Sequence, residues 1–185
     1  MVTMRTISNS VRRGILNEYY RYYIDEPIKA RAIIKKLDYK EDHYLLAAIA
    51  YTYLHEDKLR LAERYAMKAF ALRKNCPNTH WVLGLIRFNY GQYELAVQSF
   101  EEIIRLGVKP AVSNKCCGRP FDILSEKKNA RARINDSKFQ LYRLLIDEKP
   151  ALAKRYFREF EEGLKTNFTI VRKIYNREKK KMSGR

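Results

Sequence analysis

Glycine and proline are scarce in this sequence, with seven and five residues in a chain of 185. Tight turns draw heavily on these two residues, so their scarcity argues against a fold of many short strands. No run of about 18 apolar residues occurs, and we therefore expect no membrane span. The glycine-rich phosphate loop, His-Glu-x-x-His and Gly-x-Ser-x-Gly motifs are missing too. We predict a helical protein that is not an enzyme.

Cysteine is also in short supply, and the spacing of the three cysteines disfavours metal or redox chemistry. Cys116 and Cys117 are adjacent, and Cys76 lies far before them in the sequence. Zinc sites use cysteine pairs about two to four residues apart, and redox pairs use Cys-x-x-Cys. We predict no metal, no cofactor and no redox pair. The stretch 114–121 is interpreted as bent scaffold, with a binding loop as the alternative.

An apolar leader is missing from the N-terminal stretch before Gly14, which argues against secretion. An odd number of cysteines without such a leader fits a reducing compartment. The segment contains Arg and Ser and has no acidic residue before Glu18, so a transit peptide is the alternative. We expect a cytoplasmic protein.

Acidic residues are too few to balance the basic ones. Lys and Arg number 38 against 21 Asp and Glu, which gives a net charge of +17 and a pI near 9.8. Such an excess favours a polyanionic partner, either a nucleic acid or an acidic protein. The alternative is a basic surface that serves only solubility.

What the sequence does contain is an apolar pattern that occurs twice at one fixed offset. The paired positions are Ile49-Ala50 with Leu83-Gly84, Leu61-Ala62 with Leu95-Ala96, Ala66 with Phe100, and Ala69 with Ile103. In each copy, apolar residues at helical spacing lie on both sides of a short polar turn. In the second turn, Gly91 can adopt the left-handed backbone conformation. The pattern predicts two helix hairpins, with helices at 43–55, 59–72, 78–90 and 93–106.

The second copy resembles a tetratricopeptide repeat in Leu83-Gly84, in Gly91-Gln-Tyr-Glu-Leu-Ala96 and in Phe100. The offset between the copies also matches the length of such a repeat, about 34 residues. The first copy is similar, although in the second Trp81 lies one position late. The resemblance implies an all-α fold, a right-handed α-solenoid of antiparallel helix hairpins with a C-terminal capping helix. The same residues also resemble the tetratricopeptide chaperones of bacterial type III secretion, from which this chain differs in its basic charge.

We predict a single domain over residues 1–185, with core repeats at 43–76 and 77–110. An irregular insert is expected at 108–136, which is either a decayed repeat whose first helix is broken by Pro120 or a long inserted loop. Degenerate hairpins flank the repeats, one starting near Ser10 and the other near Ser137. The C-terminal helices are expected over 137–181, and the last, at 167–181, should act as a cap.

The resemblance implies that the first helix of each hairpin lines a concave groove. The groove positions are Tyr44, Ala47, Tyr51, Leu54, Trp81, Leu85, Phe88 and Asn89. They are mainly apolar and aromatic, which suits an extended or helical segment of a protein partner. The alternative is that the N- or C-terminal helix of the chain itself covers some of them.

Basic residues gather in two zones that could contact a polyanion. The candidate contacts are Lys127, Lys128, Arg131, Arg133, Arg172, Lys173, Arg177, Lys179, Lys180 and Lys181. Tyr19, Tyr20, Tyr22 and Tyr23 lie beside three arginines, and Arg with Tyr can grip phosphates and stack on bases. We predict a non-enzymatic adaptor or chaperone that binds a protein partner. The alternative is a basic subunit of an RNA or DNA complex.

Overall fold

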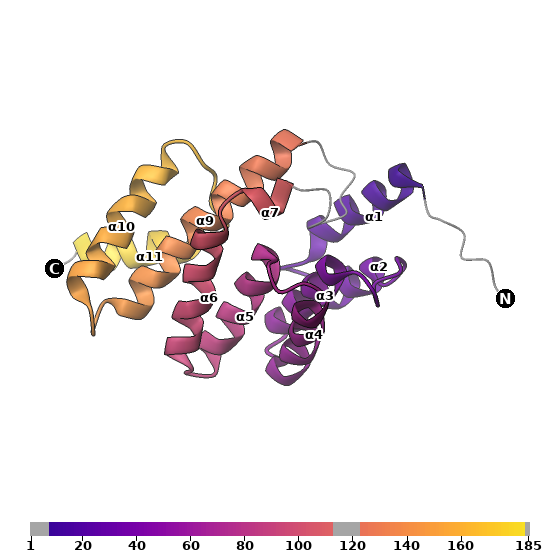
Figure 1. Ribbon diagram of the computed structural model, residues 1–185, viewed down its shortest axis with the longest axis horizontal. Helices are drawn as coiled ribbons and strands as arrows, with labels where there is room; N and C mark the ends of the chain where they lie inside the picture. Colours follow the sequence, from indigo (N-terminus) through magenta and orange to yellow (C-terminus); the bar gives the residue numbers. More distant parts are fainter. Residues whose placement is uncertain (1–7, 113–122, 184–185) are drawn as a thin grey trace.

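The computed structural model describes residues 8–112 and 123–183, and all of the regular secondary structure in them is helical. The helices form an elongated array with residues 9–22 and residues 172–183 toward opposite ends (Figure 1). They are α1 (Asn9–Tyr22), α2 (Pro27–Ile34), α3 (His43–His55), α4 (Leu59–Leu72), α5 (Pro77–Asn89), α6 (Tyr93–Leu106), α7 (Lys109–Val112), α9 (Ile123–Leu145), α10 (Pro150–Leu164) and α11 (Arg172–Ser183).

Neighbouring helices pair into hairpins, and each hairpin packs on the next. The pairs are α1 with α2, α3 with α4, α5 with α6, and α9 with α10, while α2 contacts α3, α4 contacts α5, and α6 contacts α9. This arrangement confirms the predicted all-α array of helix hairpins. Among the described helices, none is both long and apolar enough to cross a membrane.

The two central hairpins turn in the same way at equivalent positions of the sequence pattern. Asp57 and Gly91 both have positive φ, at 58° and 73°. Each is followed by an amide that donates to a carbonyl in the last turn of the preceding helix, Lys58 N to Tyr53 O at 3.0 Å and Gln92 N to Arg87 O at 2.9 Å. The expected left-handed glycine is confirmed, and the two turns share this backbone hydrogen bond as well.

A close helix approach in the second central hairpin explains one of its small residues. A Cβ atom on Gly84 would lie 2.8 Å from the Phe100 ring, which is shorter than any normal contact. Phe100 is fully buried and also meets the Trp81 ring edge-on, with centroids 5.5 Å apart. Glycine at position 84 therefore lets α5 and α6 pack closely.

The region expected to be an irregular insert differs from the prediction. Residues 109–112 form α7, and α9 begins at Ile123 rather than near Ser137. Ala132, Asn135 and Asp136 are buried at helical spacing in α9, because this early half packs against the array as well. Charged residues between these positions obscure the apolar periodicity in the sequence, so this half of the helix was not predicted. Cys116, Cys117 and Pro120 lie outside the described residues.

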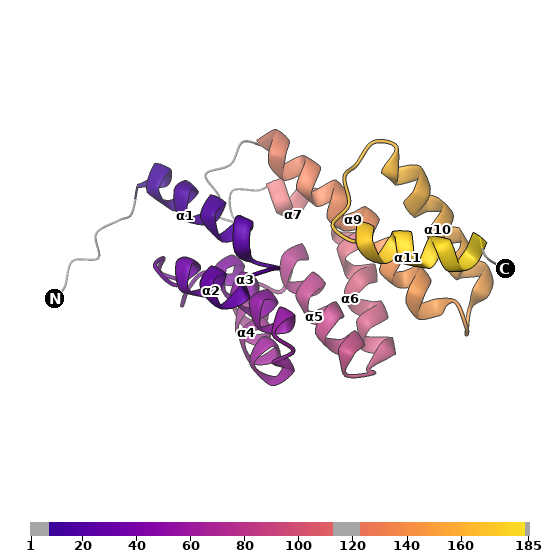
Figure 2. The same ribbon diagram turned by 180° about the vertical axis from the view of Figure 1, so that it is seen from behind.

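The last helix begins later than expected, at Arg172 instead of 167. The preceding segment is held in a non-helical form because the Asp136 carboxylate accepts hydrogen bonds from the Thr169 hydroxyl and the Ile170 amide. Figure 2 shows α11 lying across the α9–α10 hairpin. The Tyr175 ring is buried there, 5.2 Å from the Phe160 ring.

Candidate functional site

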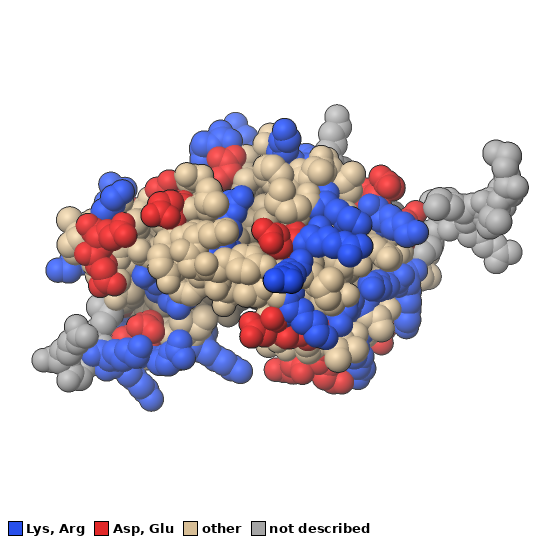
Figure 3. Space-filling model, turned by 90° about the horizontal axis from the view of Figure 1, so that it is seen from below, with Lys and Arg blue, Asp and Glu red and all other residues tan. Residues whose placement is uncertain are grey.

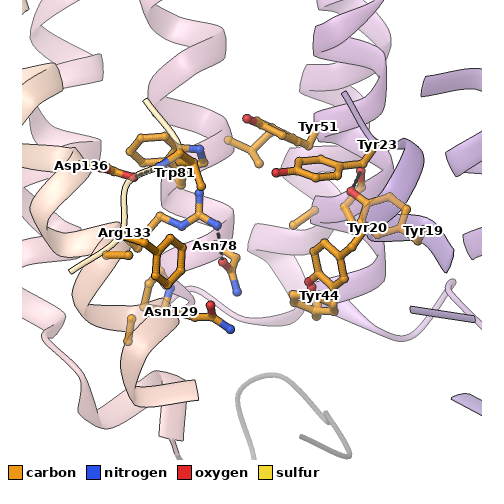
Figure 4. A pocket seen from close by; sticks show the side chains of 18 residues that line it. Tyr19, Tyr20, Tyr23, Tyr44, Tyr51, Asn78, Trp81, Asn129, Arg133 and Asp136 are labelled. Carbon is orange, nitrogen blue, oxygen red and sulfur yellow. Dashed lines mark hydrogen bonds between the residues drawn. The ribbon is translucent and has the colours of Figure 1, made fainter. Parts of the chain in front are cut away.

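A cavity of about 460 Å³ opens between the first helices of the four hairpins (Figure 4). Helices α1, α3, α5 and α9 each contribute side chains to its wall, and residues 168 and 170 complete it. A volume of roughly 300–1,000 Å³ is typical of sites that bind small ligands or side chains. We call this cavity the aromatic pocket.

Tyrosines from α1 and α3 form one wall of the aromatic pocket. Tyr19, Tyr20 and Tyr23 form a cluster with ring centroids 5.2–5.8 Å apart, and Tyr23 stacks on Tyr51 at 5.7 Å. The Tyr19 hydroxyl donates to the Ala48 carbonyl at 3.2 Å. Burial raises the pKa of Tyr51 to about 12, while Arg133 opposes the rise. This wall is therefore apolar in its ring faces and neutral at physiological pH.

Trp81 lies on the opposite wall, and the array buries all but 2% of it. Its indole nitrogen is turned toward the tyrosines (Figure 4). The indole N–H points at the Tyr51 hydroxyl without reaching hydrogen-bond geometry, and Nε1 has no hydrogen-bond partner among the described residues. A buried donor without an acceptor costs about 1–3 kcal/mol. An occupant of the pocket could satisfy it.

Arg133 from α9 lies against this same wall. Its guanidinium carbon is 4.8 Å from the centroid of the Trp81 ring, and Nη2 donates to Asn78 Oδ1 at 3.3 Å. In the described part of the chain, no carboxylate lies within ion-pair distance of Arg133. The pocket therefore holds a cation whose ring contact and single amide contact leave further N–H donors available.

Asp136, one turn further along α9, supports the wall of the aromatic pocket. It is fully buried and accepts from Thr169 Oγ1 at 2.5 Å and from Ile170 N at 3.1 Å. Burial raises the pKa of Asp136 to about 6, although both hydrogen bonds and Arg133 oppose the rise. Its two oxygens are thus engaged in fixing residues 169–170 beside the pocket.

The structure divides the predicted groove residues into two sets. Tyr44, Ala47, Tyr51 and Trp81 line the aromatic pocket. Leu54, Leu85 and Phe88 lie nearer the other end of α3 and α5, half-buried against the core. Arg143 of α9 covers Phe88, at 4.9 Å from its ring centroid, and Asn89 is exposed and donates to the Leu85 carbonyl of its own helix. The chain's own α9 and α1 thus cover part of the expected groove.

Several pocket residues were not expected from the sequence as partner contacts. They are Asn78, Asn129, Asp136, Phe168, Ile170 and the tyrosines of α1. The run of tyrosines near the N-terminus is visible in the sequence as a cluster, and its arginine neighbours predict stacking on nucleic-acid bases rather than contact with a protein. Nothing in the sequence around Asn78, Asn129, Asp136 and Phe168 distinguishes these residues from surface positions.

The predicted polyanion contacts do not form one surface. Lys127, Lys128 and Arg131 are exposed on α9, whereas Arg133 turns into the aromatic pocket. On α11, Lys179 contacts Glu161 at 3.2 Å, and Lys181 and Arg177 lie at 3.3 and 3.9 Å from Glu178. The remaining α11 cations, Arg172, Lys173 and Lys180, are exposed.

Positive charge gathers at the two ends of the array rather than in its centre. On the face in Figure 3, Lys and Arg lie over the N-terminal half and beside the C-terminal end, with Asp and Glu among them. Residues 123–183 contain 17 Lys and Arg against eight Asp and Glu, whereas residues 77–112 contain three of each. Residues 8–76 contain 14 Lys and Arg against nine Asp and Glu, so the excess of cations is largest on the last hairpin and its cap and smaller at the N-terminal end.

No cluster of three His, Cys, Asp or Glu side chains suited to a metal ion occurs within residues 8–112 and 123–183. A scan against protein-family models found no match, and searches of curated proteins and of solved structures found no significant similarity.

Proposed function

We propose that this chain is a non-enzymatic, cytoplasmic adaptor or chaperone that holds a segment of a protein partner in its aromatic pocket. We further propose that it is built on the tetratricopeptide plan. The equivalent left-handed turns at Asp57 and Gly91 support that plan. So does the close packing of Gly84 on Phe100, because the resemblance rests on both positions.

The observation that carries the proposal is where the wall of the aromatic pocket comes from. The first helix of every hairpin contributes to it, so one concave site is assembled from residues spread between 19 and 170. Tyr and Trp offer large contact area with few rotatable bonds, and both are enriched where proteins bind one another. The pocket is suited to one or two side chains of a partner segment.

A nucleic-acid function is the second candidate, and the charge of the last hairpin favours it. Its contacts would be the exposed cations on α9 and α11, outside the pocket. Within the pocket, Arg133 is the one Lys or Arg among the lining residues that the structure describes. A nucleic-acid strand presents regularly spaced phosphates and is normally held by several cations. The pocket itself therefore suits a protein segment better.

Site-specific photo-cross-linking tests the proposal. A photoreactive phenylalanine replaces Asn129, which is exposed on the pocket rim, and in a matched control it replaces Gln98, which is exposed on α6 away from the pocket. We expect a discrete protein adduct at position 129 that survives nuclease and is missing at position 98. Adducts that disappear with nuclease, or that form equally at both positions, would contradict the proposed site.

A further inference from the structure

Two unused hydrogen-bond donors share one wall of the aromatic pocket. Trp81 offers a buried indole N–H with no partner among the described residues. The guanidinium of Arg133 lies over the same indole ring, at 4.8 Å from its centroid. We propose that this wall binds the side-chain carboxylate of an acidic residue in the partner segment, next to an aromatic or aliphatic residue that packs on the tyrosines. The inference rests on the proposed function, because it specifies the chemistry of that partner.

The geometry favours an acceptor that carries a negative charge. An indole N–H is a donor only, and a guanidinium has five donors and no acceptor. A group that satisfies both must supply oxygen lone pairs, and hydrogen bonds from a guanidinium to a carboxylate are stronger than those to a neutral oxygen. Asp136, the one acid among the lining residues described, satisfies neither donor: its oxygens accept from Thr169 and Ile170. It forms no ion pair with Arg133, and the Trp81 N–H has no partner among the described residues.

The placement of Arg133 also argues for one anionic group inside the pocket rather than many. Ring contact with Trp81 and the bond to Asn78 fix the guanidinium in place, so it is organised before a ligand arrives. The tyrosine wall opposite bears no charge, and it would bury an apolar side chain adjoining the carboxylate. A short segment with an acidic and an aromatic residue side by side therefore matches both walls.

Charge beyond the pocket favours an internal acidic segment over a single chain terminus. Lys127 and Lys128 are exposed on α9 immediately before Asn129 on the pocket rim. A lone terminal carboxylate at Arg133 would leave these cations unused. The net positive charge of this part of the chain, 17 Lys and Arg against eight Asp and Glu over residues 123–183, would attract the further acidic residues of an internal segment and speed its association.

The single tryptophan of the chain makes the proposal directly measurable. In ¹⁵N-labelled protein, one indole N–H resonance reports on Trp81 alone. The first probes are 3-phenylpropionate and its uncharged analogue 3-phenylpropionamide, which differ in the carboxylate only. We expect the acid to shift the indole resonance and to bind about tenfold or more tightly than the amide. Equal binding of the two probes would overturn the carboxylate assignment.

Variants test which donor is used. Arg133→Gln should abolish the preference for the acid, whereas Arg131→Gln, the same charge change at an exposed position of the same helix, should keep it. Trp81→Phe keeps an aromatic ring at this position and removes the N–H, and calorimetry should show weaker binding of the acid in that variant. A retained preference for the acid in folded Arg133→Gln protein would contradict the proposal.

Capped peptides then distinguish the source of the anion. One hexapeptide has a central Phe-Glu pair and blocked ends, the second has Phe-Gln, and the third has Phe-Gln with a free C-terminal carboxylate. Tightest binding of the first supports an internal acidic segment, and tightest binding of the third overturns it. A dT10 oligonucleotide that shifts the indole resonance when the first peptide does not would overturn both this inference and the proposed protein partner. Equal binding of the first two peptides would overturn this inference alone.

Discussion

The Arg133 guanidinium lies over the Trp81 indole ring, 4.8 Å from its centroid, and so joins α9 to α5. This contact brings a cation from the last hairpin to the centre of the array. It also closes one side of the aromatic pocket. Neither residue alone indicates a binding site in the sequence. Trp81 has the character of a core residue, and Arg133 is one of many basic residues. Their juxtaposition gives the pocket its polarity.

Replacing Arg133 with Gln should change the environment of the only tryptophan and cost a modest amount of stability. A cation–π contact contributes roughly 0.5–2 kcal/mol, depending on how far it is desolvated. Because Arg133 is half-buried, we expect about 1 kcal/mol in urea unfolding together with altered Trp81 fluorescence. Arg131→Gln is the control, and it should leave both measurements unchanged. A matching spectral change in the control would show that the effect is general to α9.

Replacement by alanine should lower the stability of the fold at Gly84 and raise it at Gly14. At Gly84 an added Cβ would lie 2.8 Å from the buried Phe100 ring, and overpacking of this kind costs about 1–3 kcal/mol. At Gly14 there is nothing within 4 Å, so Gly14→Ala gains up to about 1 kcal/mol of helix propensity. We expect a lower melting temperature for Gly84→Ala and a higher one for Gly14→Ala. Shortening Phe100 to Leu should relieve the first effect. A stabilised Gly84→Ala protein would contradict the close approach.

Asp136 should make the fold less stable as the pH rises from about 4 to 6. Burial raises its pKa from 3.8 to about 6. The folded state therefore holds the proton more tightly than the unfolded state, and this stabilisation is complete below about pH 4 and lost above about pH 6. Two pKa units correspond to roughly 3 kcal/mol.

Urea unfolding of the wild-type protein and of Asp136→Asn at pH 4 and pH 7 measures this contribution. The stability of the wild type relative to the variant should be greater at pH 4 than at pH 7 by about 3 kcal/mol. Because every other acidic group is common to both proteins, their titration cancels in the comparison. A difference that does not change with pH would mean that Asp136 titrates normally.

The ion pair between Arg31 and Glu56 should contribute far more to the stability of the fold than the exposed pair of Lys29 with Glu26 at the start of α2. Arg31 contacts Glu56 with both side chains about nine-tenths buried, and it lies over the Tyr53 ring at 3.9 Å. Removing one partner of a buried pair costs about 3–5 kcal/mol. Lys58 also contacts Glu56, so we expect the lower end of that range for Arg31→Ala. Lys29→Ala, which breaks an exposed pair with Glu26, should cost less than about 1 kcal/mol. A double variant, Arg31→Ala with Glu56→Ala, should recover part of the loss.

The exposed cations at the start of α9 decide between the two candidate functions. If they hold a nucleic acid, reversing Lys127, Lys128 and Arg131 to Glu should flatten the plot of log affinity against log salt, because fewer counterions are released. Each lost phosphate contact reduces the slope by about 0.7–0.9. We expect instead that the wild-type protein shows only weak, unselective binding to dT10 at physiological salt, measured by fluorescence anisotropy. Tight binding with a steep slope that the triple variant removes would favour the nucleic-acid function.

The sequence by itself determined the all-α fold and the bounds of the central helices. Predicted helices at 43–55, 59–72 and 93–106 agree with the structure, because apolar periodicity and turn residues act over a few positions. The local sequence pattern was also enough to predict the left-handed backbone conformation of Gly91. It failed in α9, where buried Ala132 and Asp136 alternate with charges that dilute the apolar stripe.

Only the tertiary structure decided what the aromatic pocket contains. Its walls come from four helices spread between residues 19 and 136, and no sequence spacing links Trp81 to Arg133 or Asp136 to Thr169. Whether an arginine lies in solvent or over a buried indole depends on how the last hairpin packs on the central ones. That packing is set by the sum of many apolar contacts along α6 and α9. For this reason, four of the predicted groove residues line the pocket while the other four lie outside it.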